Sequence, residues 1–451
     1  MAHDTTVHEG VEDLGDGLVM RRATPEDAED LARFHATQQA YPPDTYEESI
    51  HHWTLDLVGG SGRHPHPFFR ASDFLIVEDT ANRQIASSMG LISQVWSYSG
   101  IPFKVGQPEL VSTHPDYRRK GLVRKQFDVI HRWSAERGEL AQTISGIPWY
   151  YRQFGYEMTL SYGGGRAGYT PHVPSLKEGQ AEPYNIRQAT EADIPFMSPM
   201  LEQMSRRCLV TAVKDEQQLR YELSGRGEGT LVRKVLCVIE TPRGEPVGML
   251  VHDYRMPGTY LVAYVYEVKP GVSWTAVTPT VVRHMAATGR QFAQKNEGEW
   301  NTFVFSLGTE HPAYDSLPDR LPRTLRSFAW YVRVPDVPAF VRHVGKAIEQ
   351  RLPGSVVEGH TGEVRLNFYR SGLLLGFEAG KLARVEPWRS ARTEEGSAGF
   401  PDLTFLQLLF GFRSLEDLEY AFPDCWVRGD EVRALLNTIF PKRPSSIWAN
   451  G

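Results

Sequence analysis

The stretch from Gln107 to Lys125 reads QPELVSTHPDYRRKGLVRK and decides the fold of the first third of the chain. Residues up to Thr113 have the pattern of a strand, His114-Pro115-Asp116 that of a turn, and the residues after Gly121 the apolar spacing of a helix. Five of the eight residues from Arg118 to Lys125 are basic. Cations at a helix start oppose its dipole by about 0.3–1 kcal/mol each, so we expect an anion such as a phosphate on the exposed N–H groups, with a solvated basic turn as the alternative.

A second stretch, WYYRQFGYE, runs from Trp149 to Glu157. Together the two stretches resemble the GCN5-related N-acetyltransferase (GNAT) superfamily. Its acetyl-CoA motif, Q/R-x-x-G-x-G/A, matches the residues from Arg118 to Gly121, with Val123 in place of the last small residue, and the second stretch is similar to its F-Y-x-x-x-G-F. The resemblance implies a strand that binds the pantetheine arm of acetyl-CoA and a turn that binds its pyrophosphate. The implied contacts are Leu110, Val111, Ser112 and Thr113 on the strand, and Arg118, Arg119, Lys120, Gly121, Leu122, Val123 and Arg124 at the turn.

Two side chains near these stretches are candidates for proton transfer. By resemblance, Tyr151 falls on the tyrosine that protonates the departing thiolate in many members of the superfamily; the alternative is a place in an aromatic core. An amine nucleophile must first lose a proton, and Glu109 is a candidate base or water-positioning residue, with a solvated carboxylate as the alternative. Strand alternation predicts that Gln107, Glu109, Val111 and Thr113 share one face.

The start of the chain is echoed once further along. MRRATPED from Met20 to Asp27 recurs as IRQATEAD from Ile186 to Asp193, with Thr24 and Thr190 as the expected helix caps and an acid three residues later. Each half is therefore expected to begin with a strand, a capped helix and antiparallel strands, unless the motif arose twice as an ordinary helix start. The residues from Gly163 to Pro183 are expected to be a tail and a linker, and GGGRAG within them is not expected to bind a dinucleotide because no helix pattern follows it.

The last segment has a helical pattern from Asp336 to Leu352, followed by strand patterns and three short helical patterns. We therefore expect an α+β fold with domains at residues 1–180, 184–334 and 335–451. Two tandem GNAT-type mixed-sheet domains followed by an SCP2-like (sterol carrier protein 2-like) α+β domain resemble the plan of the enhanced-intracellular-survival (Eis) family. The second GNAT-type domain is expected to be degenerate, because GVSWTA from Gly271 to Ala276 lacks the Arg-x-x-Gly of a cofactor turn.

The Eis resemblance implies further properties. Members acetylate aminoglycoside-, polyamine- or lysine-like amines and form homo-oligomers, in particular hexamers. In the best-known members the terminal carboxylate reaches the active site as a base, which would here belong to Gly451, although this tail lacks their aromatic end. The net charge of −6 favours a cationic acceptor and argues against nucleic acid or an anionic membrane as a partner.

No metal site is expected from the sequence. Cys208, Cys237 and Cys425 lie far apart, and the histidines show no H-E-x-x-H spacing. Cysteine usage and the lack of an apolar stretch long enough to span a bilayer favour a cytoplasmic protein. We expect an acetyl-CoA-dependent N-acetyltransferase in which a small-molecule or peptidyl amine attacks directly in a ternary complex. The alternative is a non-catalytic carrier whose SCP2-like domain holds an apolar ligand.

Overall fold

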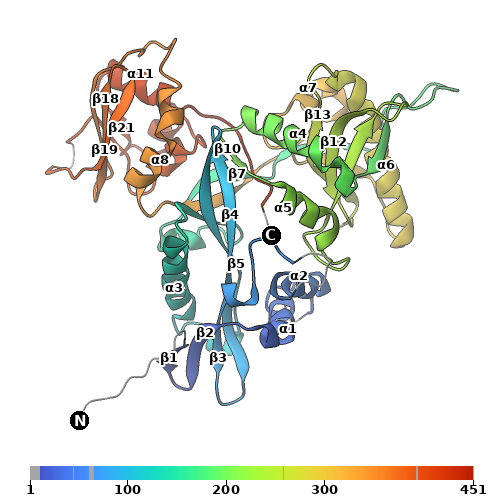
Figure 1. The fold of residues 1–451 in the computed structure, drawn as a ribbon, viewed down its shortest axis with the longest axis horizontal. Coiled ribbons are helices and arrows are strands. Elements are labelled where there is room, and N and C mark those ends of the chain that lie inside the picture. The colour runs from blue at the N-terminus through green and yellow to red at the C-terminus, as the bar shows by residue number, and fades with distance from the viewer. Residues whose placement is uncertain (1–10, 44, 60–64, 257, 393–394, 450–451) are drawn as a thin grey trace.

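The computed structural model describes residues 11–43, 45–59, 65–256, 258–392 and 395–449. They form three β-sheets with helices packed against them, and this mixed α+β architecture confirms the predicted fold class. Figure 1 shows one body around each sheet, the first in blue to teal, the second in green to yellow and the third in orange to red. No helix in this described part of the chain is long and apolar enough to cross a membrane.

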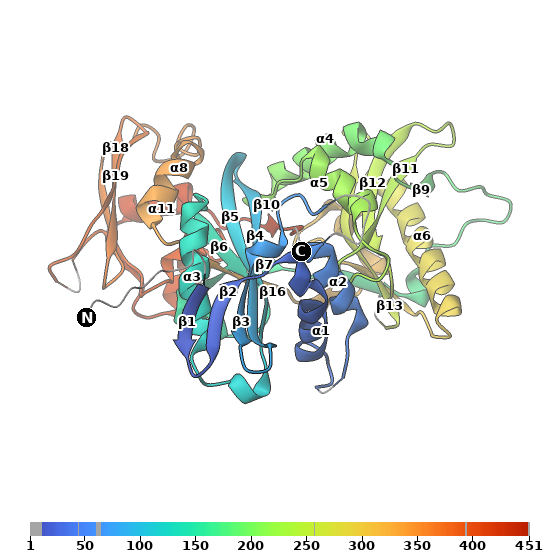
Figure 2. The ribbon, with the colours of Figure 1, turned by 60° about the horizontal axis from the view of Figure 1, so that its bottom comes forward.

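Two long antiparallel strands form the centre of the first sheet. In spatial order the strands are β1 (Val11–Gly15), β2 (Leu18–Arg22), β3 (Phe74–Asp79), β4 (Gln84–Tyr98), β5 (Ile101–Thr113), β6 (Ala141–Ile144), β16 (Phe328–Arg333) and β7 (Glu157–Tyr162). Two further strands, β10 (Val210–Ala212) and β22 (Ser445–Ser446), extend the sheet from the end of β4. Helices α1 (Ala28–Gln38) and α2 (Glu48–Val58) cover one face of the sheet, and α3 (Leu122–Glu136) covers the other (Figure 2).

The second sheet repeats this arrangement. Its strands, in spatial order, are β9 (Asn185–Gln188), β11 (Lys234–Glu240), β12 (Pro246–Asp253), β13 (Tyr260–Val268), β14 (Thr302–Phe305), β8 (Gly165–Tyr169) and β15 (Arg323–Leu325). Three antiparallel pairings, from β9 to β13, lead to the parallel pair β13–β14. The three from β2 to β5 likewise lead to the parallel pair β5–β6, and the first sheet has β1 as an additional strand before them. The helices of this half are α4 (Ile194–Arg207), α5 (Glu216–Arg220), α6 (Trp274–Lys295) and α7 (Pro312–Ser316).

The two halves exchange one strand with each other. β16, which follows the second half in sequence, lies between β6 and β7 of the first sheet and pairs antiparallel with both. In return, β8, which follows β7 in sequence, lies between β14 and β15 of the second sheet and pairs antiparallel with both. The linker expected from Gly163 to Pro183 is therefore wrong over Gly165–Tyr169. Glycine permits this strand, because a Cβ at Gly165 would collide with the carbonyl oxygen of Phe305.

The sequence repeat is also a repeat of side-chain contacts. Arg21 donates two hydrogen bonds of 2.8 Å to the carboxylate of Asp27, and Arg187 donates two of 2.8 Å to Asp193. In both halves the aspartate also accepts the backbone N–H of the threonine cap three residues earlier. The arginine lowers the pKa of Asp193 to about 2. The prediction of two similarly capped starts is thus confirmed at the level of individual contacts.

The third sheet packs on the first through aromatic side chains. Its strands are β19 (Lys381–Pro387), β18 (Gly372–Glu378), β17 (Gly362–Asn367), β20 (Ala398–Gly399) and β21 (Trp426–Val427), with helices α8 (Val337–Glu349), α9 (Phe405–Leu409), α10 (Leu415–Ala421) and α11 (Asp430–Ile439). The ring of Tyr98 on β4 meets that of Phe340 on α8 edge to face at 6.0 Å, a geometry worth about 0.5–1.5 kcal/mol beyond burial. The Tyr98 hydroxyl also donates to the carbonyl of Leu409 at 2.8 Å.

Candidate active site

The candidate cofactor site begins where β5 and β6 separate. These strands pair only at Val105–Ala141 and Gly106–Gln142. Beyond Gly106, β5 keeps its pairing with β4, but no described strand pairs with its other edge. The backbone groups of residues 107–113 that point to this edge can therefore bond an extended ligand. They include Leu110 to Thr113, for which the resemblance implies contacts with the pantetheine arm.

A bulge changes which side chains of β5 share a face. Leu110 has a φ of +53°, and one extra residue stands on β5 there relative to β4. Gln107 and Glu109 lie towards α1 and α2, whereas Val111 packs in the α3 cluster and Thr113 bonds a serine that also bonds α3. The predicted common face for these four residues is wrong, because strict alternation does not survive an inserted residue.

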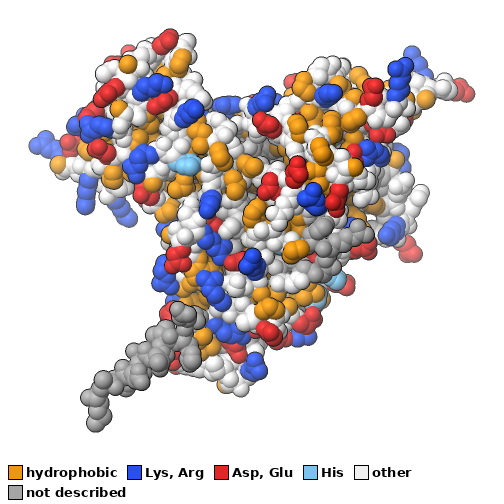
Figure 3. Space-filling view, viewed as in Figure 1, with side chains coloured by type: hydrophobic (Ala, Val, Ile, Leu, Met, Phe, Trp, Pro, Cys, Tyr) orange, Lys and Arg blue, Asp and Glu red, His pale blue; other side chains and the backbone are white. Residues whose placement is uncertain are grey.

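The basic turn leads into helix α3 at the end of this edge. Gly121 is the N-cap with a φ of +76°, and a Cβ built on it would meet nothing within 4 Å, so the backbone is open to a ligand. The first N–H groups of a helix have no partner inside the helix. Figure 3 shows Lys and Arg side chains along the surface over α3. The cations of the turn are exposed and form no salt bridge with any residue that the structure describes: Arg118, Arg119, Lys120, Arg124 and Lys125.

Tyr151 lies in a short turn after β6, with its ring buried. The ring packs between Phe127 of α3 and Tyr331 of β16, at centroid distances of 6.2 and 5.9 Å. Its hydroxyl bonds no described residue, and a Cβ on Gly146, just beyond β6, would lie 3.9 Å from it. Burial raises the pKa of Tyr151 above its ordinary value of 10, and the carboxylate of Glu109 raises it further. The phenol therefore keeps its proton at neutral pH, as a proton donor must.

The exchanged strand β16 holds the turn that carries Tyr151. The hydroxyl oxygen of Tyr331 accepts the backbone N–H of Trp149 at 2.5 Å. Trp149 has a φ of +66°, a conformation that needs such support in a bulky residue. Tyr331 could not be predicted from the sequence, because nothing in an apolar strand pattern indicates that the strand crosses into the other sheet.

Glu109 ends a chain of hydrogen bonds that runs along β4 and β5. The Trp96 ring N–H donates to Gln94 at 3.1 Å, Gln94 donates to Gln107, and Gln107 donates to Glu109 at 2.5 Å. Burial raises the pKa of Glu109 above its ordinary value, against the opposing effect of the bond from Gln107. A carboxylate with a raised pKa is a stronger base than one in solvent, and this suits it to accept a proton from an ammonium group.

Glu109 lines a large cavity in which the three segments of the chain meet. The cavity has a volume of about 1540 Å³. Its walls include Trp53 of α2, Tyr264 of β13 and Trp448 near the C-terminus. The tail reaches this cavity as far as Ala449, and Gly451, the predicted alternative base, lies outside the described residues.

The charged groups that line this cavity are mostly basic. The basic residues of the lining are Arg226, Arg233, Lys234, Arg255, Arg323 and Arg326, and the acidic ones are Glu47, Glu109 and Asp253. Lys234 is paired with Asp253 at 2.9 Å, and Arg226 with a buried glutamate. Arg233, Arg323 and Arg326 form no salt bridge within the part of the chain that the structure describes. The acidic net charge of the whole chain therefore does not extend to this cavity.

The corresponding region of the second half is filled by its own side chains. Tyr266 of β13 packs against Trp274 at the start of α6 at 5.0 Å, and Trp274 packs against His311 at 5.2 Å. The first turn of α6, which begins at Trp274, contains no acidic or basic residue. These contacts support a second half that walls the cavity rather than one that binds its own cofactor.

The structure brings most of the predicted site residues to one region. The strand edge carries Leu110 to Thr113, the turn from Arg118 to Arg124 lies at its end, and Tyr151 and Glu109 interact electrostatically beside it. Gln107 and Glu109 share a face of β5 as alternation predicts, but alternation alone does not indicate a hydrogen bond between them. The sequence did not indicate the arginines of the cavity, because the cavity walls come from distant segments.

Residues 19–159 match the family model described as "Acetyltransferase (GNAT) domain". A search of curated proteins finds no match. This family match runs from β2 to the start of β7 and includes the bulged strand, the basic turn and Tyr151. The rest of the first sheet (β1, β10, β16 and β22) and the second and third sheets lie outside it.

Several solved structures share the fold of almost the whole chain. A GCN5-related N-acetyltransferase from Kribbella flavida has a TM-score of 0.63 at 16% identity, covering 95% of this chain and 97% of its own. One from Anabaena variabilis has a TM-score of 0.64 at 13% identity, covering 95% and 99%. Eis1 from Mycobacterium abscessus has a TM-score of 0.55 at 10% identity, covering 96% and 99%. At these identities the likeness concerns the fold alone, and the similarity to the GNAT family model concerns residues 19–159.

Proposed function

We propose that the protein is an acetyl-CoA-dependent N-acetyltransferase that acts on an amine by direct attack in a ternary complex. The observation that carries this proposal is the placement of three features around one strand edge. The edge of β5 beyond Gly106 has no paired strand, the cationic start of α3 lies at its end, and the Tyr151 hydroxyl stands beside it without a partner among the described residues. Acetyl-CoA supplies an activated acetyl thioester to such a site.

Each of these groups has a role in the proposed reaction. The free backbone groups of residues 107–113 bind the pantetheine amides, and the N–H groups after Gly121 bind the pyrophosphate together with Arg119 and Arg124. Glu109 accepts a proton from the acceptor ammonium, directly or through a water, so that the amine can attack the thioester carbonyl. Tyr151 donates its hydroxyl proton to the departing sulfur. The carboxylate of Gly451 remains a rival to Glu109 as the base.

The acceptor that fits this cavity is an amine that also carries an anionic group. Arg233, Arg323 and Arg326 line the cavity without a carboxylate partner in the described chain, while Glu109 lies on β5 at the reaction end. An acceptor with an ammonium group near Glu109 and a carboxylate or phosphate near the arginines is complementary to both. Lysine, free or in a peptide with neighbouring acidic groups, has this character, whereas a purely cationic polyamine does not.

The function is tested by following thiol release from acetyl-CoA with paired amines. Lysine and cadaverine differ only in the carboxylate, so we expect kcat/KM to be higher for lysine. The double variant Arg323→Gln/Arg326→Gln should lower kcat/KM for lysine about 10²-fold and leave cadaverine unchanged, since each of the two charge-assisted contacts contributes about 1.5–3 kcal/mol. Arg290→Gln, on α6 and outside the cavity lining, is the matched control. No thiol release with any amine would contradict the enzyme and favour the carrier alternative.

We also propose that the protein is a homo-oligomer, with the hexamer as the expected state. Val356 and Tyr420, both in the third segment, are 90% and 94% exposed. Exposed apolar side chains of this size indicate an association surface where they belong to one contiguous patch, and we propose these two as its members. Light scattering coupled to size-exclusion chromatography gives the mass directly, and Val356→Asp with Tyr420→Asp should reduce it to that of the monomer.

A further inference from the structure

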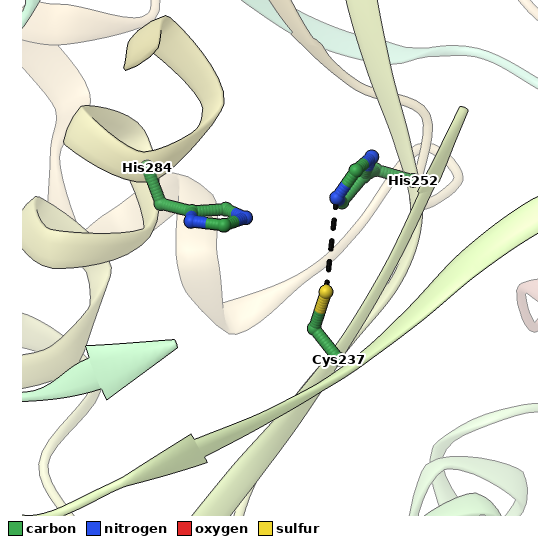
Figure 4. Close-up of side chains that lie close together, drawn as sticks. All are labelled: Cys237, His252 and His284. Atoms are coloured by element: carbon green, nitrogen blue, oxygen red, sulfur yellow. Dashed lines mark hydrogen bonds between the residues drawn. The ribbon is translucent and has the colours of Figure 1, made fainter. Parts of the chain in front are cut away.

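The core of the second half contains a cluster of three metal-binding side chains. Cys237 lies on β11, His252 on the neighbouring β12 and His284 on α6, which packs over these strands (Figure 4). Both Cys237 and His252 are 2% exposed. In Figure 4 the three side chains converge on one point between the sheet and the helix. The cluster is separate from the cavity that contains Glu109, and none of its three members lines that cavity.

The distances within the cluster fit a small metal ion. Cys237 Sγ lies 3.7 Å from His252 Nε2, and one ligand atom from each of the three residues lies within 4.8 Å of the other two. Tetrahedral zinc with Zn–S of about 2.3 Å and Zn–N of about 2.0 Å holds its S and N ligand atoms about 3.5 Å apart. The Cys237–His252 pair is close to this separation, and a small movement of the His284 side chain, whose ligand atom lies within 4.8 Å of both others, completes the set.

Hydrogen bonding prepares the histidines as ligands. His252 Nδ1 lies 2.8 Å from the carbonyl oxygen of Asp253, which can only accept, so Nδ1 carries the proton and the lone pair of Nε2 faces Cys237. A hydrogen bond of this kind to the second ring nitrogen orients a metal-bound histidine. His284 Nε2 is buried and has no hydrogen-bond partner among the described residues. A hydrogen-bonded core without a metal would satisfy His252 and Cys237 but leave this nitrogen unpaired.

We propose that Cys237, His252 and His284 bind a transition-metal ion of the zinc class. On binding, the Cys237 thiol releases its proton to solvent and its sulfur bonds the metal, while both imidazoles remain neutral. One thiolate and two imidazoles, with a water as the fourth ligand, form a set that zinc accepts. The ion joins β11, β12 and α6, so it stabilises the half of the chain that lacks a cofactor turn. The site could not be predicted from the sequence, because Cys237 and His252 are 15 residues apart, His252 and His284 are 32 apart, and the three match no metal-binding motif.

Metal content is the first test, and it does not depend on any acetyltransferase activity. Full-length protein purified without chelators or immobilised-metal resins should contain about one zinc ion per chain, as measured by inductively coupled plasma mass spectrometry. After removal of the metal with a chelator, added Co²⁺ should produce a thiolate-to-cobalt charge-transfer band in the near ultraviolet, which reports the Cys237–metal bond itself. Wild-type protein with neither zinc nor this band would overturn the proposal.

Variants assign the metal to the three residues. Cys237→Ser should abolish the cobalt band, and Cys425→Ser, which removes another buried cysteine far from the cluster, should keep it. Because a serine in the core can prevent folding, His284→Gln on the half-buried face of α6 is the second variant. Added Zn²⁺ should raise the Tm of the chelator-treated wild type and of Cys425→Ser, but not that of His284→Gln. An equal rise in all three proteins would contradict the site.

Discussion

The amide nitrogen Nε2 of Gln107 donates a 2.5 Å hydrogen bond to Oε2 of Glu109, two residues further along β5. This bond favours the ionised carboxylate, whereas burial disfavours it and prevails, so the pKa of Glu109 is raised. Burial and the bond from Gln107 thus act in opposite directions on the pKa of Glu109, and burial has the larger effect. Gln107 orients the carboxylate towards the cavity, and burial makes the carboxylate basic enough to take a proton from an amine.

Glu109→Gln tests this carboxylate as the base. We expect kcat/KM for an accepted amine to fall about 10²-fold, the effect of losing a general base. In the wild type the acid limb of the pH profile should lie above 4.5, the ordinary value for a glutamate, and the variant should lack that limb. Glu136→Gln, an exposed glutamate on α3, is the control. An unchanged limb would remove Glu109 and leave the Gly451 carboxylate or a water as the base.

The same variant has an effect on stability that depends on pH. A carboxyl group whose pKa is raised by folding contributes stability below its unfolded pKa and loses that contribution as the pH rises through its folded pKa. Glu109 thus destabilises the wild type at neutral pH relative to Glu109→Gln. Thermal denaturation should give the variant the higher Tm at pH 7–8, with the difference lost below about pH 4. If Glu109→Gln instead had a lower Tm than the wild type at pH 8 and an equal Tm at pH 4, the pKa of Glu109 would not be raised by folding.

Tyr151→Phe removes the proposed proton donor and keeps the ring. We expect kcat to fall about 10²-fold or more while coenzyme A affinity stays nearly unchanged, because the hydroxyl bonds no described residue and the ring packing is conserved. Tyr150→Phe, at the adjacent position, is the matched control and should have little effect. Steady-state kinetics with calorimetric binding of coenzyme A separates the two quantities. An unaffected kcat would exclude Tyr151 as the acid.

Tyr331→Phe tests whether the exchanged strand positions Tyr151. The change removes the acceptor of the Trp149 N–H bond and leaves the strand itself intact. One hydrogen bond contributes about 0.5–1.5 kcal/mol, so kcat should fall by up to about 10-fold without a change in the KM for acetyl-CoA. A general loss of packing would instead lower the Tm and alter both constants. Tyr314→Phe, which alters a buried tyrosine of α7 in the second half, is the comparison.

Neutralising the turn at the start of α3 should weaken cofactor binding. Arg119→Ala and Arg124→Ala are each expected to raise the Kd for coenzyme A about 10-fold, since each loses a charge-assisted contact with a phosphate. The effect should shrink as salt is added, because exposed charges are screened. Arg132→Ala lies on the same helix beyond its first turns and should bind normally. Equal effects at all three positions would indicate a change of net charge rather than a phosphate site.

Local patterns predicted much of this fold. The strand, turn and helix from Gln107 to Lys125 appear as β5, a 3-10 turn and α3, and the helix over Asp336 to Leu352 appears as α8. Each of these elements depends on turn chemistry and apolar spacing within about 20 residues, which a sequence displays directly. The repeated start at Thr24 and Thr190 is a signal of the same local kind.

The features that sequence analysis missed all depend on contacts between distant residues. The exchange of β8 and β16 pairs residues more than 130 positions apart, and the bulge at Leu110 depends on the register of β4. The clustering of Cys237 with His284 likewise requires a helix to pack on a particular face of a sheet. Neither periodicity nor motif spacing contains this information.

Isothermal titration of coenzyme A into the full-length protein tests the central claim most directly. The account predicts one binding site per chain, because the first half has an open strand edge with a cationic helix start while the second half is filled by Tyr266 and Trp274. Binding should be lost or strongly weakened in the combined variant Arg119→Ala/Arg124→Ala. Two sites per chain, or no binding to the wild type at millimolar coenzyme A, would contradict it.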